Sequence, residues 1–115
     1  MHRQGCDPQN IQPEDILCDF CEQPWSDDRP MVEGHRGSCI CGPCLTVAYA
    51  TCINAKNDDP RAPTETCTLC LEPSDERRHW RSPMREQALV CSRCLKQAGG
   101  ALHKDADIAW RKPTS

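Results

Sequence analysis

The chain has 115 residues, a formal net charge of −3 and eleven cysteines. Leu, Ile, Val and Phe together account for only 16 of the 115 residues, which is too few for a chain of this size to build an ordinary apolar core. Such a chain is either disordered or stabilised by another kind of bond, and the cysteines offer one. The mild negative charge argues against a protein whose main role is to grip nucleic acid.

The beginning of the chain bears on the redox state of the cysteines. Residues 1–10 are polar and lack the apolar segment of a secretory signal. No run of the sequence approaches the roughly 18 apolar residues of a membrane span. An odd number of cysteines also fits a disulfide framework poorly. We therefore expect a cytoplasmic chain without membrane contact, whose reduced thiols bind metal.

Eight of the cysteines form four CxxC pairs. Nineteen residues separate Cys21 from Cys41, and twenty separate Cys70 from Cys91. This is the spacing of zinc sites with four thiolate ligands. The second set begins 49 residues after the first, so the chain contains an internal repeat. We predict two zinc ions per chain, held by two sets of ligands: Cys18, Cys21, Cys41 and Cys44, then Cys67, Cys70, Cys91 and Cys94.

The repeat also predicts the domain organisation. The stretch between the two copies is rich in proline and acidic residues and nearly free of apolar ones, as in a linker. The expected parts are an N-terminal tail at 1–15, a first zinc module at 16–55, a linker at 56–64, a second zinc module at 65–104 and a C-terminal tail at 105–115. We expect the C-terminal tail to be helical up to Trp110.

Each module is expected to contain a hairpin and a helix. Short apolar stretches at 38–40 and 88–90 read as strands that end just before the second CxxC pair. The apolar residues Leu45, Tyr49, Cys52 and Ile53 fall on one helical face. The face of the second helix, at Leu95, Ala98 and Leu102, is interrupted by Gly99-Gly100.

Each of these two glycines weakens a helix by about 1 kcal/mol, so an interruption is expected there. The predicted fold class is a small, metal-stapled α+β chain of two tandem treble-clef-like zinc fingers. Each finger has the order knuckle, β-hairpin, and second knuckle at a helix start.

The segment Cys41-Gly42-Pro43-Cys44 has the same letters as the redox centre of thioredoxins. A helix start stabilises a thiolate, which serves a redox enzyme and a zinc site equally. The chain lacks the apolar runs of a thioredoxin sheet, and the second module keeps the two sulfurs without the Gly-Pro. Metal binding is therefore favoured over thiol redox chemistry. Four thiolates would also accept iron, but the clustered glycines of rubredoxin loops are absent, which favours zinc.

Three motifs of the first module resemble a known family. They are LCDFC at 17–21, MVEG at 31–34 and ICGPCL at 40–45. This pattern, over about residues 17 to 53, is similar to the N-terminal zinc-binding domain of the ClpX chaperone. The resemblance implies metal-ligand roles for Cys18, Cys21, Cys41 and Cys44.

In the ClpX family this domain dimerises and recruits substrates and adaptors for an ATP-driven unfoldase. This chain has no Gly-Lys pair and hence no Walker A loop, and its second module keeps little beyond the cysteines. The resemblance therefore implies a free-standing interaction module. We expect this module to form a homodimer or, because of the internal repeat, an intramolecular pseudo-dimer, which would bury Leu45, Tyr49 and Ile53 against the face around Leu95 and Leu102.

Several other residues were weighed as ligands or contact sites. We expect Cys39 to be a half-buried strand thiol, Cys52 to lie in the core, and Cys6 to be a free thiol. A site shared by Cys6 and His2 is a minor alternative. The histidines His35, His79 and His103 are expected to face solvent. Trp25 and Trp110 are each expected to cover the core of a small module.

The region from Arg77 to Arg85 is the one basic and aromatic patch. Arginines near an aromatic ring can bind phosphate and stack on bases, but they also balance the negative charge of a four-thiolate zinc site. The leading prediction is a non-enzymatic, adaptor-like or dimerising zinc module that binds a protein partner, because both sites have four protein ligands and no open position. The alternative is a nucleic-acid-binding tandem zinc finger that uses this patch. The third hypothesis is a thiol redox protein whose active cysteines are Cys41 and Cys44.

Overall fold

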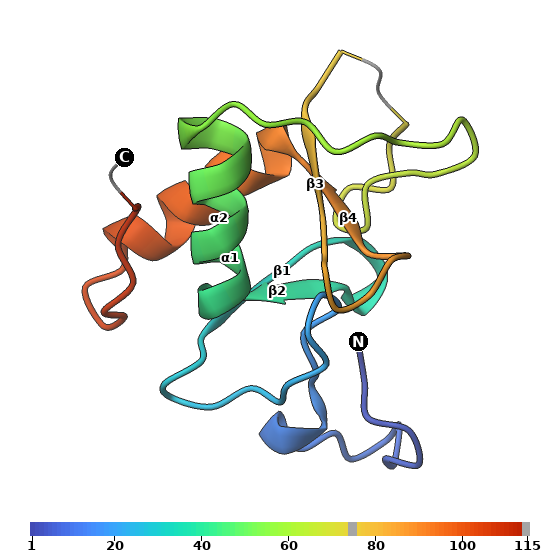
Figure 1. Cartoon of the computed structure of the whole chain (residues 1–115). Coiled ribbons are helices and arrows are strands. Elements are labelled where there is room, and N and C mark those ends of the chain that lie inside the picture. Colours follow the sequence, from blue (N-terminus) through green and yellow to red (C-terminus); the bar gives the residue numbers. More distant parts are fainter. Residues whose placement is uncertain (74–75, 114–115) are drawn as a thin grey trace.

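A computed structural model describes residues 1–73 and 76–113 of the chain. It contains two antiparallel β-hairpins, each followed directly by a helix (Figure 1). The elements, in chain order, are η1 (Pro13–Asp15), β1 (Met31–Glu33), η2 (His35–Gly37), β2 (Cys39–Cys41), α1 (Gly42–Ala48), η3 (Tyr49–Asn54), β3 (His79–Arg81), β4 (Leu89–Cys91) and α2 (Ser92–Lys104). Both predicted hairpins form, with their second strands one residue later than expected.

The internal repeat is visible in the backbone. Met31 pairs with Cys41 in the first hairpin, and His79 pairs with Cys91 in the second. Glu22 and Leu71, each one residue beyond a first CxxC pair, share the left-handed conformation with φ of 62° and 63°. We refer to residues 16–55 as repeat one and residues 65–104 as repeat two. This register makes position 31 equivalent to 79, and position 41 equivalent to 91.

The first helix begins where the second CxxC pair of repeat one predicts. Cys41 is the N-cap of α1, and Pro43 lies in its first turn, where a missing N–H costs nothing. The helix continues directly into η3, a π-helical turn. Leu45 and Cys52 are fully buried on the predicted apolar face.

The second helix runs without a break through Gly99-Gly100, so the predicted interruption is wrong. Gly99 is buried at the place where α2 packs against η3. A Cβ atom at Gly99 would lie 2.9 Å from Cε2 of Tyr49, so only glycine allows this close approach of the two helices. Tertiary packing therefore outweighs the low helix propensity of glycine.

The two repeats build one core between them. The two helices cross each other next to the hairpins (Figure 1), and α2 contacts both α1 and η3. The Phe20 ring of repeat one packs on the Trp80 ring of repeat two, with centroids 5.8 Å apart. Leu45, Leu95 and Leu102 are all buried in the same apolar cluster.

The repeats also exchange hydrogen bonds in both directions. The backbone N–H of His35 donates to the carbonyl oxygen of Leu69 at 2.7 Å, and the hydroxyl of Ser82 donates to the carbonyl oxygen of Phe20. Phe20 and Leu69 occupy the same place inside the first CxxC pair of their repeats, and both donors lie just after the first strand of a hairpin. Each hairpin turn therefore docks on the first knuckle of the other repeat, as in a two-fold interface.

The C-terminal segment is an extended strap rather than a helix. Helix α2 ends at Lys104, and residues 105–113 are non-helical, so the predicted helix up to Trp110 is wrong. The Trp110 indole Nε1 donates to Thr46 Oγ1 at 2.8 Å, and its ring contacts the Tyr49 ring edge-on. These side-chain contacts with the α1–η3 helix fix the strap. Residues 114–115 of the predicted tail lie outside the described residues.

The two tryptophans differ in their roles. Trp110 covers the helix pair as predicted, whereas Trp25 is 38% exposed. The linker is also more ordered than its composition suggests. The carboxylates of Asp58 and Asp59 accept hydrogen bonds from the backbone N–H groups of His79 and Arg81, at 3.0 and 2.8 Å. The linker thereby covers the free edge of β3.

The two adjacent glycines of α2 provide a test of the packing. We expect Gly99→Ala to lower the free energy of unfolding by about 1 kcal/mol or more, because its methyl group would displace the Tyr49 ring. Gly100→Ala meets open space and should raise it by about 0.5–1 kcal/mol through helix propensity. Urea unfolding of both variants at one fixed zinc concentration measures the difference. Equal effects of the two substitutions would contradict the close helix contact.

Candidate metal centres

Centre one gathers four cysteines from three parts of repeat one. Cys18 and Cys21 lie in the turn before β1, Cys41 ends β2, and Cys44 lies in the first turn of α1. All four Sγ atoms lie within 4.8 Å of one another, and Cys21 and Cys41 Sγ are 3.6 Å apart. Cys18 and Cys41 are fully buried, whereas Cys21 and Cys44 are half-buried.

Centre two repeats this arrangement in repeat two. Cys67 and Cys70 lie in the equivalent turn, Cys91 ends β4, and Cys94 lies in the first turn of α2. Their Sγ atoms also lie within 4.8 Å of one another. The Cys67–Cys94 and Cys70–Cys91 sulfur distances are 3.8 and 3.9 Å. The structure thus brings all eight predicted ligands into two groups that could hold a metal ion.

The sulfur geometry fits a tetrahedral ion. Zn–S bonds of about 2.3 Å in a tetrahedron place the sulfurs about 3.8 Å apart. The observed separations of 3.6–3.9 Å match this edge and are far longer than a disulfide bond of about 2.05 Å. A set of four sulfur donors suits zinc or iron rather than magnesium or calcium, which prefer oxygen.

Backbone donors support the negative charge on the sulfurs. Cys18 Sγ accepts N–H bonds from Phe20 and Cys41, each at 3.3 Å, and Cys67 Sγ accepts one from Cys91 at 3.4 Å. Hydrogen bonds from the Cys41 and Cys44 thiols lower the pKa of Cys18, and those from Cys67 and Cys94 lower the pKa of Cys91. The same contacts raise the pKa values of Cys41, Cys44, Cys67 and Cys94, so only a bound cation would hold four anionic sulfurs together in each centre.

Centre two carries a cationic rim. The Arg77 Nη1 lies 3.9 Å from the sulfur of Cys91 and 4.0 Å from that of Cys70. Glu72 holds both Arg77 and Arg93 in ion pairs of 3.1 and 2.8 Å. The position of Arg77 fits the expectation that an arginine balances the thiolate charge. Glu72 and Arg93 were not predicted as site residues, and their only signal in the sequence was their position beside and inside CxxC pairs.

The other arginines of the basic patch are engaged within the chain. Arg78 Nε donates to the Cys52 carbonyl at 3.0 Å, and Arg85 Nη1 donates to the Asp19 carbonyl at 2.6 Å. Arg81 forms an ion pair with Glu65 at 2.7 Å and also donates to the carbonyl oxygens of Pro60 and Glu86. The remaining ring of the patch, Trp80, is 6% exposed. These arginines hold the hairpin to the linker and to repeat one.

The predicted solvent exposure of His79 is wrong. Its side chain is only 3% exposed, because the linker lies across β3 and covers it. His35 and His103 are exposed as predicted. His35 lies in the turn after β1, where its backbone rather than its ring contacts repeat two.

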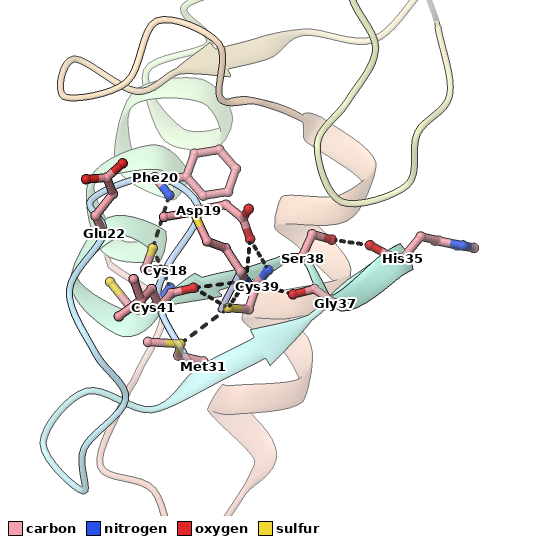
Figure 2. A network of polar contacts seen from close by, with 12 residues as sticks. Cys18, Asp19, Phe20, Glu22, Met31, His35, Gly37, Ser38, Cys39 and Cys41 are labelled. Atoms are coloured by element: carbon pink, nitrogen blue, oxygen red, sulfur yellow. Dashed lines mark hydrogen bonds and ion pairs between the residues drawn. The ribbon is translucent and has the colours of Figure 1, made fainter. Parts of the chain in front are cut away.

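A polar network beside centre one fixes the first knuckle. Figure 2 shows the Asp19 carboxylate next to the backbone of Cys39, whose N–H donates to Asp19 Oδ2 at 2.6 Å. The same oxygen lies 3.2 Å from the amino group of Met1. Asp19 was not among the predicted site residues, and its position inside the first CxxC pair was the only signal in the sequence.

The three remaining cysteines are not in the centres. Cys39 is fully buried rather than half-buried, and its thiol donates to the Leu17 carbonyl at 3.0 Å. Burial raises its pKa. Cys52 lies in the core as predicted, and burial raises its pKa to about 11. Cys6 is half-buried in the N-terminal segment.

Comparisons with known proteins place no constraint on these assignments. No family model, no curated protein and no solved structure matches the chain. Within residues 1–73 and 76–113, no helix is long and apolar enough to cross a membrane. The interpretation of the two centres therefore rests on their own geometry.

Metal content per chain tests the two centres. Mass spectrometry of the purified protein is expected to find two zinc ions, one for each four-sulfur group of the described residues. Replacing one ligand, by Cys44→Ser or Cys94→Ser, should reduce the content to about one ion, because a structural site needs all four donors. The control Cys6→Ser should retain both. Metal-free wild-type protein that unfolds at the same urea concentration as the loaded form would contradict a structural role.

The buried Cys52 thiol predicts a loss of stability in alkali. Its pKa is raised from 9.0 to about 11, so the unfolded chain ionises this thiol first as the pH rises. The neutral thiol's contribution is complete below about pH 9 and falls by about 2 kcal/mol by pH 11. Urea unfolding at both ends of this range should show the loss in the wild type. The Cys52→Ala variant should have a lower free energy of unfolding at pH 9 and should lack this part of the decrease between pH 9 and pH 11. Parallel curves of unfolding free energy against pH for the two proteins would contradict the prediction.

Proposed function

We propose that the chain is a non-enzymatic protein-interaction module stabilised by two zinc ions. The observation that carries this proposal is the closed geometry of the two centres, in which four sulfurs lie within 4.8 Å of one another. A four-coordinate ion there would have every position filled by protein, with none left for water or substrate. The metal would then serve the fold, and the function would lie on the surface.

Each repeat is proposed to be a treble-clef-like finger. A first CxxC turn precedes a hairpin, and the second CxxC pair begins at the end of the hairpin and enters the helix. The left-handed residues Glu22 and Leu71, at equivalent places after the first pair, support a common turn geometry in both fingers. This order is the one that a treble clef requires.

The two fingers are proposed to form a pseudo-dimer inside one chain. The reciprocal contacts of His35 with Leu69 and of Ser82 with Phe20 support this arrangement. Leu45 and Leu95 are fully buried within the single chain, so this face is not open to a second copy. An internal partner is therefore favoured over the homodimer that the resemblance to the ClpX domain also allows.

The remaining apolar surface is proposed to bind a protein partner in the cytoplasm. Met84 is 72% exposed and Val47 is 52% exposed, although the chain has few large apolar residues to spare. Exposed apolar side chains gathered over a groove are typical of interaction sites. None of the eleven cysteines, all of which are among the described residues, forms a disulfide, which favours a reducing compartment.

The proposal is tested by proximity labelling with the tagged full chain in its native cells. The wild type is expected to label a defined set of proteins, and a variant combining Cys44→Ser with Cys94→Ser should lose this set, because both fingers unfold without metal. Arg36→Ala, a change at an exposed turn residue, serves as the control and should keep it.

Two other results would overturn the proposal. One is a salt-dependent complex with oligonucleotides that combined Arg78→Ala and Arg81→Ala abolish, which would favour nucleic-acid binding. The other is insulin reduction by the zinc-loaded wild type that Cys41→Ser removes. Nucleic-acid binding is not expected, because Arg77, Arg78, Arg81 and Arg85 all contact groups of the chain itself. Insulin reduction is not expected, because Cys41 is fully buried.

A further inference from the structure

The two-fold arrangement creates two grooves at equivalent places. Each groove lies between the metal centre of one repeat and the hairpin turn of the other. The first, of about 240 Å³, we name the apolar groove; it is lined by Cys21, Pro43, Cys44, Val47, Pro83 and Met84. The second, of about 400 Å³, we name the polar groove; it is lined by Gly34, His35, Cys70, Arg93, Cys94 and Gln97.

The chemistry of the two grooves has diverged at matched positions. Inside the second CxxC pair, the apolar groove has Pro43 where the polar groove has Arg93. One turn further along the helix, it has Val47 where the other has Gln97. Both residues of this second pair are exposed, so neither is needed to fill the core. The lining of the first groove is therefore mostly apolar, whereas the lining of the second is a mixture of polar and apolar groups.

An arginine with no partner lies at the apolar groove. Arg29 lines this groove beside Gln23 and Cys21. No described residue forms a hydrogen bond or an ion pair with its guanidinium, and its Nε is shielded from solvent without an acceptor. Arg29 is half-buried and has no acid partner among the described residues, so an anionic group bound in the groove would pair with its guanidinium.

Repeat two shows what this arginine would bind. The hairpin register makes Arg29 equivalent to Arg77, and the turn geometry makes Gln23 equivalent to Glu72. In repeat two, Glu72 holds Arg77 at 3.1 Å. In repeat one, the neutral amide of Gln23 stands where repeat two has the Glu72 carboxylate. Arg29 therefore lacks the acidic partner that Arg77 has.

We propose that the apolar groove binds an acidic, apolar segment of a partner protein. An aliphatic or aromatic side chain of the partner enters between Val47 and Met84, and a neighbouring Asp or Glu carboxylate pairs with Arg29. This carboxylate takes the place that Glu72 takes beside Arg77. The inference rests on the proposed function as an interaction module and assigns its contact site and the chemistry of its partner.

A selection experiment tests the chemistry of the partner segment. Random linear peptides displayed on phage are selected on the immobilised, zinc-loaded full chain. The enriched peptides are expected to share an Asp or Glu next to an aliphatic or aromatic residue. Enrichment of basic peptides, or no enrichment over the immobilised Arg29→Gln chain, would overturn the proposal.

Matched variants then test the groove itself. The leading peptide is synthesised with blocked ends, so that its only carboxylates are side chains, and its affinity is measured by calorimetry. Val47→Asp places a charge in the apolar groove and should weaken binding about tenfold or more. Gln97→Asp makes the same change at the equivalent exposed position of the polar groove and should alter the affinity by less than about twofold.

A double-mutant cycle isolates the proposed ion pair. Arg29→Gln should weaken binding of the acidic peptide by about tenfold. For a peptide whose Glu is replaced by Gln, the same substitution should reduce the affinity little further. Additive losses would overturn the pairing. Peptides that bind wild type, Val47→Asp and Gln97→Asp equally would leave an interaction module but place its contact site elsewhere. Failure of the proposed function itself appears separately, as a wild-type chain that labels no defined set of proteins in cells.

Discussion

The gathering of four cysteine sulfurs at each of two centres that could hold a metal ion is the constraint on which the fold depends. The strands are three residues long and α1 has seven residues, which is too short for either element to be stable alone. Each centre ties a loop, a strand end and a helix start together. A structural zinc ion bound at such a centre would supply on the order of 10–16 kcal/mol of binding free energy that is also folding free energy. That contribution would stabilise a chain that has only 16 Leu, Ile, Val and Phe residues to build its core.

The second source of stability is the contact between the repeats. Each hairpin turn satisfies a knuckle carbonyl of the other repeat, and the Phe20 and Trp80 rings pack between them. The arginines of the second hairpin belong to this architecture. Arg85 reaches the Asp19 carbonyl in repeat one, and Arg81 fixes the linker by donating to the Pro60 carbonyl oxygen. The arginines that resemble a nucleic-acid site in the sequence therefore hold the hairpin, the linker and repeat one together.

The sequence predicts the local features well, because ligand spacing encodes them directly. The eight ligand positions, the repeat and the start of each helix follow from the CxxC pairs. The features it predicts wrongly depend on contacts between distant segments. Helix α2 survives Gly99 because Tyr49 approaches from the other repeat, and His79 is buried because the linker folds back over it. That Arg29 lacks the acidic partner of its counterpart Arg77 can be recognised only from the strand register of the two hairpins.

The fusion of two fingers in one chain has a consequence for stoichiometry. In a homodimer of identical fingers every substitution occurs twice, so both grooves must keep the same chemistry and would bind two copies of a partner. Here Pro43 and Arg93, or Val47 and Gln97, differ although they occupy equivalent places. The molecule therefore has two chemically distinct ends. One ligand would bind at one end, in a single orientation, with a ratio of one partner to one chain.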